Sequence, residues 1–242
     1  MSASAPSFDF RYIDTPAGSL PCIVRGPASG PQLLIIPPLF EEMNRTRALL
    51  AGVGRGLADR GIGSWLPDLP GTGDSDSLLT SVVWSDWRQA IQLVSQHIGA
   101  NSGKGIFSFA VRGGALLDDA AEIAVRMRLA PVTSGDRLLR ELLRTRVAAD
   151  QERGTPTSLA SLEQQLQSTM LELGGYPITP ALAAGLSAAR ASPIAPGRTA
   201  ALAGGVGDLI FEGPPVWRQA EPIAARALAD DLAAWIALCI GC

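Results

Sequence analysis

The sequence contains very little histidine and cysteine, which limits the chemistry that its 242 residues can perform. His97 is the single histidine, so any mechanism that uses an imidazole depends on this one residue. Three cysteines are too few for a disulfide framework. Cys239 and Cys242 have C-x-x-C spacing, but no second ligand pair accompanies them and Cys22 lies far away in the chain. We therefore expect no metal site and no cofactor.

An excess of positive charge and long apolar runs are also missing. Lysine plus arginine number 20 against 23 aspartate plus glutamate, and no basic stripe stands out, so nucleic acid is not an expected partner. No uncharged apolar run approaches the roughly 20 residues of a spanning helix. Residues 1–10 have neither the positive nor the apolar region of a signal peptide. We expect a cytoplasmic protein without a membrane span.

The apolar residues that are present follow an alternating pattern. They make up 47% of the chain against 18% charged residues, which suits a sheet buried on both faces. Short apolar runs alternate with segments of helical spacing, as in βαβ units. We expect an α/β fold, α/β-hydrolase-like, with a mostly parallel twisted sheet and helices on both faces, in a single domain over residues 1–242. The expected strands are residues 8–13 and 20–25 (an antiparallel hairpin), 32–36, 63–66, the strand from 106, 129–132, 199–203 and 208–211, and the expected helices are 43–60, 84–98, 114–127 and 220–239.

Helical segments dominate from Ser134 to about Arg190, and we expect no strand among them. Thr155-Pro156 and Thr179-Pro180 provide the N-cap and first-turn residues expected at the starts of two helices. We interpret residues 134–190 as a small helical cap inserted into the domain.

The stretch IFSFAVRGG, which begins at Ile106, predicts a buried strand, a sharp turn of small residues and the start of a helix. It resembles the nucleophile elbow of α/β hydrolases, G-x-S-x-G, which holds a serine on a strained corner at a helix N-terminus. In this register the serine position is Arg112, and a protonated guanidinium cannot attack a carbonyl. Ser108 lies within the strand, short of the corner, and is a poor candidate for the nucleophile.

The other members of a catalytic triad are missing as well. An acid after the penultimate strand would be Asp208, and the histidine should follow the last strand, in residues 212–217, where there is none. His97 lies near the end of the helix that precedes the elbow strand, where the helix dipole favours it. A Ser-His-Asp mechanism is therefore excluded by residue inventory.

A polar loop, PPLFEEMNRTR from Pro37 to Arg47, leaves a buried strand where α/β hydrolases supply an oxyanion-hole amide. Glu41 and Glu42 are candidates for a general base, or they only favour the positive end of the helix that follows. Adjacent residues point in different directions, so we do not expect both to face one substrate. We assign ligand binding to Pro38, Leu39, Asn44, Arg47, Arg112 and Gly113.

Arg112 has two interpretations, and the sequence leaves both open. At a helix N-terminus it would clamp a carboxylate, phosphate or sulfate of a ligand. Alternatively, it forms an internal salt bridge with Glu41 or Glu42. The loop DLPGTGDS, which begins at Asp68, resembles the D-x-P-G-x-G-x-S loop of many α/β hydrolases. Its glycines permit a tight turn, and Asp68 and Asp74 can bond local amides, so it indicates the fold.

Taken together, these loops resemble an α/β-hydrolase-like family called exosortase A system-associated hydrolase 2. The similar parts are the Pro37 to Arg47 loop, the arginine at the elbow, Leu138 to Ala149 and Gly175 to Ala184, and the resemblance covers most of residues 20–200. It implies a link to exopolysaccharide and protein-sorting gene clusters of Gram-negative bacteria. The family's hydrolase label rests on its fold, which does not supply a reaction.

Three hypotheses about function follow from these residues. The first is a pseudoenzyme that binds a small molecule, anionic or saccharide-linked, or a partner in the former active-site cleft. The second is an active hydrolase that cleaves an ester, thioester or glycosidic bond with Glu41 or Glu42 as base. The third is a structural subunit of an envelope-polysaccharide assembly with a closed, dry cleft. A homo-oligomer is compatible with all three.

Overall fold

The computed structural model describes residues 8–16, 18–102, 105–195, 197–219 and 225–241. Its main sheet has eight strands in the order β1-β2-β4-β3-β5-β6-β9-β10. β2 pairs antiparallel with β1 and β4, and the other neighbours pair parallel, so the predicted mostly parallel sheet and its N-terminal hairpin are confirmed. The strands are β1 (Phe8–Thr15), β2 (Gly18–Arg25), β3 (Gln32–Ile36), β4 (Gly63–Pro67), β5 (Ile106–Val111), β6 (Val125–Leu129), β9 (Gly197–Leu202) and β10 (Leu209–Phe211).

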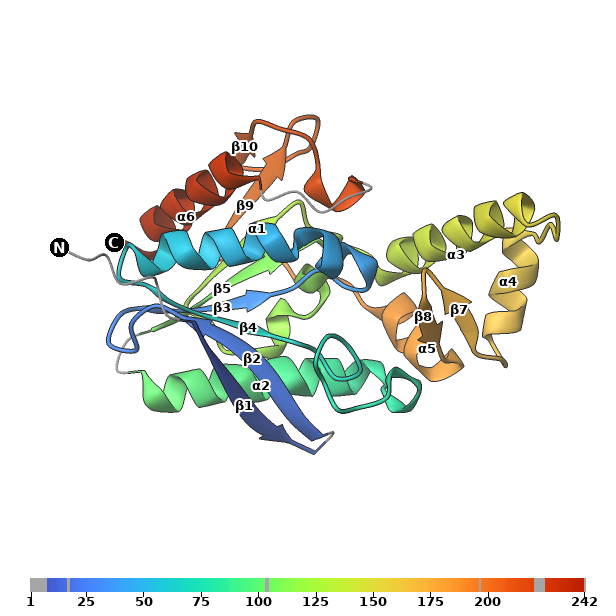
Figure 1. Ribbon diagram of the computed structural model, residues 1–242, viewed down its shortest axis with the longest axis horizontal. Helices are drawn as coiled ribbons and strands as arrows, with labels where there is room; N and C mark the ends of the chain where they lie inside the picture. Colours follow the sequence, from blue (N-terminus) through green and yellow to red (C-terminus); the bar gives the residue numbers. More distant parts are fainter. Residues whose placement is uncertain (1–7, 17, 103–104, 196, 220–224, 242) are drawn as a thin grey trace.

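Helices cover both faces of this sheet. α1 (Glu41–Ala58) and α6 (Arg226–Ile240) lie on one face and α2 (Trp84–Asn101) on the other (Figure 1). Successive side chains of β3 alternate between the two layers: Leu33 packs in the core with α1 and α6, whereas Leu34 packs in the core with α2. Both faces of β3 are therefore buried, which explains its unbroken apolar sequence. Residues 220–224, the start of the helix expected at 220–239, lie outside the described residues.

The chain after the elbow strand differs from the prediction. The helix expected at 114–127 is replaced by two short 3-10 turns, Arg112–Leu116 and Asp118–Ala120, and then by β6. The strand expected at 129–132 is accordingly β6, shifted toward the N-terminus. The alternation VRMRL has the period of two of a strand. Its Arg128 is nevertheless buried, because Asp118 neutralises it within the core.

An inserted segment connects β6 to β9, beyond the carboxyl ends of the strands (Figure 1). The expectation that it holds no strand was wrong, because β7 and β8 form an antiparallel hairpin. The turn between them, Gly174-Gly175, has positive φ values of 60° and 84°, which glycine adopts freely. The elements of this segment are α3 (Gly135–Glu152), α4 (Leu159–Leu166), β7 (Leu171–Leu173), β8 (Tyr176–Ile178) and α5 (Pro180–Ala188).

The caps of these helices follow the sequence only in part. Thr179 caps α5 as predicted, since its hydroxyl accepts a hydrogen bond from the Leu182 amide at 3.2 Å. Thr155-Pro156 starts no helix; instead Ser158 caps α4 by accepting from the Ser161 amide at 3.1 Å. The two ends of the inserted segment meet, because the Gly135 amide donates to the Ala189 carbonyl at 3.0 Å.

Candidate functional site

Strained backbone gathers at one edge of the sheet. Of the four described non-glycine residues with positive φ, three, Phe40, Arg112 and Ala130, have values of 59°, 52° and 44° and follow the neighbouring strands β3, β5 and β6. Positive φ is uncommon outside glycine, and residues held in this region cluster at functional sites. The carboxyl edge of the sheet, where α/β folds bind ligands, is therefore the candidate site.

The elbow keeps the shape of a nucleophile corner although its tip is arginine. A Cβ on Gly114 would lie 2.5 Å and 2.6 Å from the carbonyl oxygens of Ile36 and Pro37, so only glycine allows this turn to close against the end of β3. A Cβ on Gly113 would lie 2.9 Å from Cγ of Leu39. Gly113 and Leu39, both predicted to bind ligand, thus pack against each other at the base of the site.

The guanidinium of Arg112 is held by an internal carboxylate. Its Nε donates to Glu42 at 3.1 Å and 3.3 Å from the two carboxylate oxygens, and its Nη1 donates to the Ala130 carbonyl at 3.2 Å. Both side chains of the pair are only 14% exposed. Of the two interpretations of Arg112, the structure shows the internal salt bridge, with Glu42 as the partner. Glu41 points elsewhere and pairs with Arg45 at 3.5 Å.

An aromatic ring completes the enclosure of Arg112. The ring of Trp217 lies 5.0 Å from the guanidinium carbon, within the range of a cation–π contact. Trp217 belongs to the turn after β10, the segment in which a catalytic histidine was sought and not found. Its carbonyl accepts a hydrogen bond from Arg45 at 3.2 Å, which ties this turn to α1. The turn after β10 thus contributes an indole ring, and no imidazole, to the surroundings of Arg112.

Burial controls the protonation of Glu42. Loss of solvent raises the pKa of this carboxyl from its ordinary value of 4.5. The positive charge and hydrogen bonds of Arg112 act in the opposite direction, while the negative charges of Glu141 and Glu41 add to the increase. The net pKa is raised, so burial outweighs the ion pair. The neutral form of Glu42 is accordingly favoured in the folded chain more than in water.

The expected anion-attracting helix at the elbow does not form. The residues after Val111 make a 3-10 turn, Arg112–Leu116, in place of the predicted long helix. A single short turn aligns few peptide dipoles, so it gives little of the positive potential that a helix N-terminus provides. The prediction that Arg112 lies at the N-terminus of an anion-binding helix was therefore wrong.

A small cavity lies between residues 37–47 and the loop that follows β4. Its volume is about 20 Å³, which is room for about one water molecule. Tyr176, at the start of β8, closes it: the Asn44 amide donates to the Tyr176 hydroxyl at 3.3 Å. Arg47 binds the carboxylate of Asp68 at 3.3 Å on another side. The predicted ligand-binding residues Pro38, Leu39, Asn44 and Arg47 line this cavity, whereas Arg112 and Gly113 are not among its lining residues.

Sequence reasoning did not find Tyr176, Trp217 and the strained Phe40. Phe40 packs between Trp87 and Tyr176, with ring centroids 5.5 Å from each and interplanar angles of 58° and 70°. The signals in the sequence were weak: an aromatic residue after the Gly-Gly pair of a turn, and a tryptophan where a histidine was sought. Both rings reach the site only through the tertiary arrangement of distant segments.

The remaining candidate residues lie away from the site. Asp208 binds the backbone of Thr199, its carboxylate accepting from the amide at 2.7 Å, and it sits near Cys239 at the end of α6. His97 packs on Trp65 with ring centroids 5.5 Å apart. It lies roughly 20 Å along α2 from the helix start. Ser108 is fully buried in β5, and its hydroxyl has no hydrogen-bond partner among the residues that the structure describes. The structure thus assembles no pair of nucleophile and base from them.

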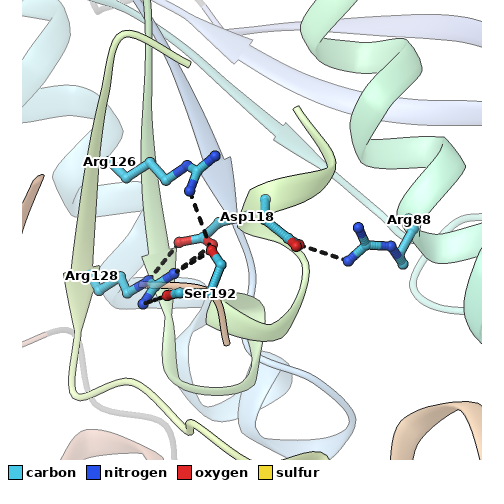
Figure 2. Close-up of polar contacts among 6 residues, drawn as sticks. Arg88, Asp118, Arg126, Arg128 and Ser192 are labelled. Atoms are coloured by element: carbon cyan, nitrogen blue, oxygen red, sulfur yellow. Dashed lines mark hydrogen bonds and ion pairs between the residues drawn. The ribbon is translucent and has the colours of Figure 1, made fainter. Parts of the chain in front are cut away.

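The turn after the elbow carries a second arginine–carboxylate pair, shown in Figure 2. Arg128 donates from Nε and Nη2 to the two oxygens of Asp118 at 2.6 Å and 2.7 Å. Its Nη1 donates to the carbonyl of Ser192, which lies on the chain returning from the inserted segment. The pair is 5% and 0% exposed, so it is sealed from solvent and joins three parts of the chain. The hydroxyl of Ser192 also accepts from Arg126, and Arg88 binds Asp119 on the adjacent surface.

The described residues contain neither a metal-binding cluster nor a membrane-spanning helix. Within the described ranges, no group of three or more His, Cys, Asp and Glu residues is placed to hold a metal ion. Cys22 is buried in β2 and Cys239 lies in α6, while Cys242 is outside the described residues. None of the helices described here is long and apolar enough to cross a membrane.

In the loop after β4, Asp68 accepts a hydrogen bond from the Asp74 amide at 3.0 Å. This is the local bonding expected of that loop.

Comparison with known proteins identifies the fold. No protein-family model and no curated protein sequence matches the chain. Among solved structures, Est1E from Butyrivibrio proteoclasticus, in a complex with ferulic acid, aligns with a TM-score of 0.66 at 14% identity over 94% of this chain and 98% of its own. Alpha/beta hydrolase domain-containing protein 10 from mouse aligns with a TM-score of 0.59 at 15% identity, over 97% of this chain and 98% of its own. Epoxide hydrolase VrEH1 from Vigna radiata aligns with a TM-score of 0.58 at 13% identity, with the same coverage.

The sheet order, the elbow and these likenesses agree. The chain has the α/β-hydrolase fold, as the sequence predicted. A strained corner follows β5, and Arg112 stands at its tip with a φ of 52°.

Proposed function

We propose that this protein is a pseudoenzyme of the α/β-hydrolase fold, which binds a ligand or a partner at its carboxyl-edge site and does not hydrolyse it. One observation carries the proposal. Arg112 stands at the nucleophile corner with a φ of 52°, and Glu42 and Trp217 hold its guanidinium there. Hydrolysis by a triad needs a nucleophile and a base within hydrogen-bonding reach, and both positions are occupied by other groups.

The cavity lined by Asn44, Arg47 and Tyr176 supports a ligand that accepts hydrogen bonds. Asn44, Arg47 and the Tyr176 hydroxyl present donors around it. Such donors suit an anionic small molecule or one linked to a saccharide. The cavity holds about one water in this structure, so a ligand enters when Tyr176 moves away from Asn44. In this proposal residues 134–190 act as the cap of the site within a single domain.

The resemblance of the site loops to exosortase A system-associated hydrolase 2 supports a place in an exosortase-linked exopolysaccharide pathway, with the protein in the cytoplasm. The loops from Pro37 to Arg47 and at Arg112 carry that resemblance, and they are the loops that form the site. A structural subunit of an envelope-polysaccharide assembly would share the closed cleft, and it would bind a partner rather than a small molecule.

A second candidate function is an active hydrolase that acts on an ester, thioester or glycosidic bond, with Glu42 or Glu41 as base. The raised pKa of the buried Glu42 carboxyl favours it, because general acids and bases are tuned in this way. The esterase and epoxide hydrolase structures with which the chain aligns have the same fold. Against it stands the contact of both Glu42 oxygens with Arg112.

A labelling and turnover experiment separates these functions. The protein is incubated with a fluorophosphonate probe and with panels of acyl esters, thioesters and glycosides. We expect neither labelling nor turnover above background, and we expect Arg112→Ser to restore neither, because Trp217 stands where the base would be. Turnover by the wild type that Glu42→Gln or Glu41→Gln abolishes would establish the second function in place of the first.

Ligand binding is tested by thermal unfolding in the presence of inorganic phosphate, glucuronate or glucose. We expect phosphate or glucuronate to raise Tm, and Arg47→Gln to remove that increase. Arg137→Gln is the matched control, because the Arg137 side chain is 77% exposed on α3, outside the cavity. The same increase in Arg47→Gln and in the wild type, or no increase with any probe, would count against a site for such ligands.

A further inference from the structure

A row of aromatic side chains is exposed on the outermost strand of the sheet. Phe8, Phe10 and Tyr12 on β1 are 52%, 48% and 65% exposed. Alternate residues of a strand share a face, so the three rings form one stripe. Phe8 and Phe10 already touch edge to face, with centroids 5.6 Å apart. An ordered aromatic stripe in solvent marks an interaction surface.

The edge of β1 is open to further pairing. β1 ends the strand order of the sheet, and no other strand of the described residues pairs with its outer side. Its eight residues pair with β2 in one continuous register, so no bulge interrupts the strand. Edge strands are usually protected by a short length, a bulge, a proline or charged side chains. The strand β1, FDFRYIDT, lacks the first three and carries charged side chains such as Asp9 and Arg11.

The charges on β1 specify which partner fits. Asp9 and Arg11 lie on the face opposite the aromatic stripe and bind each other at 3.0 Å, with side chains 64% and 57% exposed. If a second β1 pairs antiparallel about Phe10, then Asp9 lies opposite Arg11 of the second copy, and Arg11 opposite its Asp9. Opposite charges placed across two strands attract. Pairing about Asp9 or about Arg11 would instead place like charges opposite each other.

The same register aligns the aromatic stripe. Pairing about Phe10 places this ring opposite its own equivalent and places Phe8 opposite Tyr12 of the second copy. Aromatic pairs across neighbouring strands stabilise a sheet. The pattern aromatic, acid, aromatic, base, aromatic in residues 8–12 is thus complementary to itself when the strand is reversed. Self-complementarity of this kind is the requirement of a two-fold symmetric interface.

We propose that two copies of this chain associate through β1, antiparallel about Phe10, so that their sheets join into one continuous sheet. β1 forms the edge of the sheet opposite β10, and the inserted segment lies beyond the carboxyl ends of the strands (Figure 1). The interface is a single strand of eight residues from each copy, so the dimer is weak and depends on protein concentration.

Sedimentation velocity of the full chain over a concentration series tests the proposal. The wild type is expected to shift from monomer to dimer as concentration rises. Asp9→Arg or Arg11→Asp alone should raise the dimer Kd about tenfold or more, since each places like charges opposite each other. The double variant Asp9→Arg/Arg11→Asp restores opposite charges and should return Kd to within about threefold of the wild type.

Arg137→Asp, a charge reversal at an exposed position on α3, is the control and should leave Kd unchanged. Circular dichroism confirms that each variant folds, as expected for side chains this exposed. A wild type that stays monomeric at every concentration overturns the proposal, and this outcome includes the case in which the stripe serves a different protein. A double variant no better than the single ones also overturns it.

Discussion

Two arginines in adjoining parts of the sheet each bind a carboxylate, and their surroundings differ. Arg128, within β6, makes two short bonds to Asp118, 2.6 Å and 2.7 Å long, and the pair is sealed from solvent. Arg112, at the tip of the elbow, makes longer bonds of 3.1 Å and 3.3 Å to Glu42. Both side chains of this pair keep some exposure to solvent. Arg112 also contacts the Trp217 ring and a backbone carbonyl.

The Arg128–Asp118 pair therefore stabilises the fold, whereas the Arg112–Glu42 pair lies in the candidate site. Asp118 and Arg128 compensate each other where water is absent, and removing either leaves a buried charge. Glu42 can become neutral, because burial already raises the pKa of its carboxyl. The elbow pair is therefore the one that can respond to protons or to a ligand, while the inner pair holds the turn that supports it.

The largest effect is expected when the inner pair is broken. Arg128→Met leaves the Asp118 carboxylate buried without its cation, and we expect unfolding free energy to fall by about 3–5 kcal/mol. Urea unfolding measures this value. A loss below about 1 kcal/mol would show that water reaches the Asp118 carboxylate after all.

Because Arg128→Met could prevent folding, the double variant Arg128→Met/Asp118→Leu provides a second measurement. It removes both charges and leaves apolar side chains in the core. We expect it to recover most of the lost stability, since apolar replacements of a buried pair are often neutral.

Breaking the elbow pair should have a smaller effect. Glu42→Ala removes the acceptor of Arg112 but leaves the Ala130 carbonyl and the Trp217 ring in contact with the guanidinium. We expect a loss of about 1–3 kcal/mol in the same urea experiment. A loss equal to that of Arg128→Met would contradict the distinction between the two pairs.

The next, smaller effect is the pH dependence of stability that Glu42 causes. Glu42 has a raised pKa in the folded chain, so its contribution to stability is present below the ordinary value of 4.5 and is lost as pH rises through the raised pKa. Glu42→Gln mimics the neutral form at every pH. We therefore expect the stability of Glu42→Gln relative to the wild type to increase from acidic to neutral pH. Parallel stability curves of the two proteins would mean that the carboxyl has an ordinary pKa.

The smallest effect is expected from the ring over Arg112. Trp217→Phe keeps an aromatic face but weakens the cation–π contact, because indole binds cations best among the aromatic side chains. We expect a loss of about 0.5–1 kcal/mol by urea unfolding. Trp84→Phe, at a tryptophan whose ring contacts Trp87 rather than an arginine, is the control for the loss of indole size.

Most of the sheet could be predicted from periodicity, and the exceptions have a physical reason. The strands up to β5 are apolar runs or a hairpin, so local pattern is enough. β6 was predicted at 129–132 and lies at Val125–Leu129, because the burial of Arg128 depends on Asp118, ten residues earlier in the chain, and periodicity does not register such a partner. The β7–β8 hairpin was missed because three-residue strands are too short to show alternation.

Features of the site that depend on which residues are present could be predicted from the sequence. Features that depend on contacts between distant segments could not. The arginine at the elbow and the absence of a histidine after β10 are direct readings of the sequence. The choice of Glu42 over Glu41 depends on the residue at which α1 begins, which was expected at Met43 and is Glu41. Trp217 reaches Arg112 from a turn more than one hundred residues away, about which local pattern says nothing.

The closed base of the inserted segment has a consequence for how this protein can diversify. Ser134 and Arg190 form a backbone bridge, and the Ala191 amide donates to the Thr133 carbonyl at 3.1 Å. The chain therefore leaves the sheet and returns to it at neighbouring points. Lengthening a connection whose ends are already together changes the closure entropy only slowly. A change of length within the segment therefore costs little closure entropy, whereas the side chains that it packs against Trp84 and Phe40 limit which changes the core accepts.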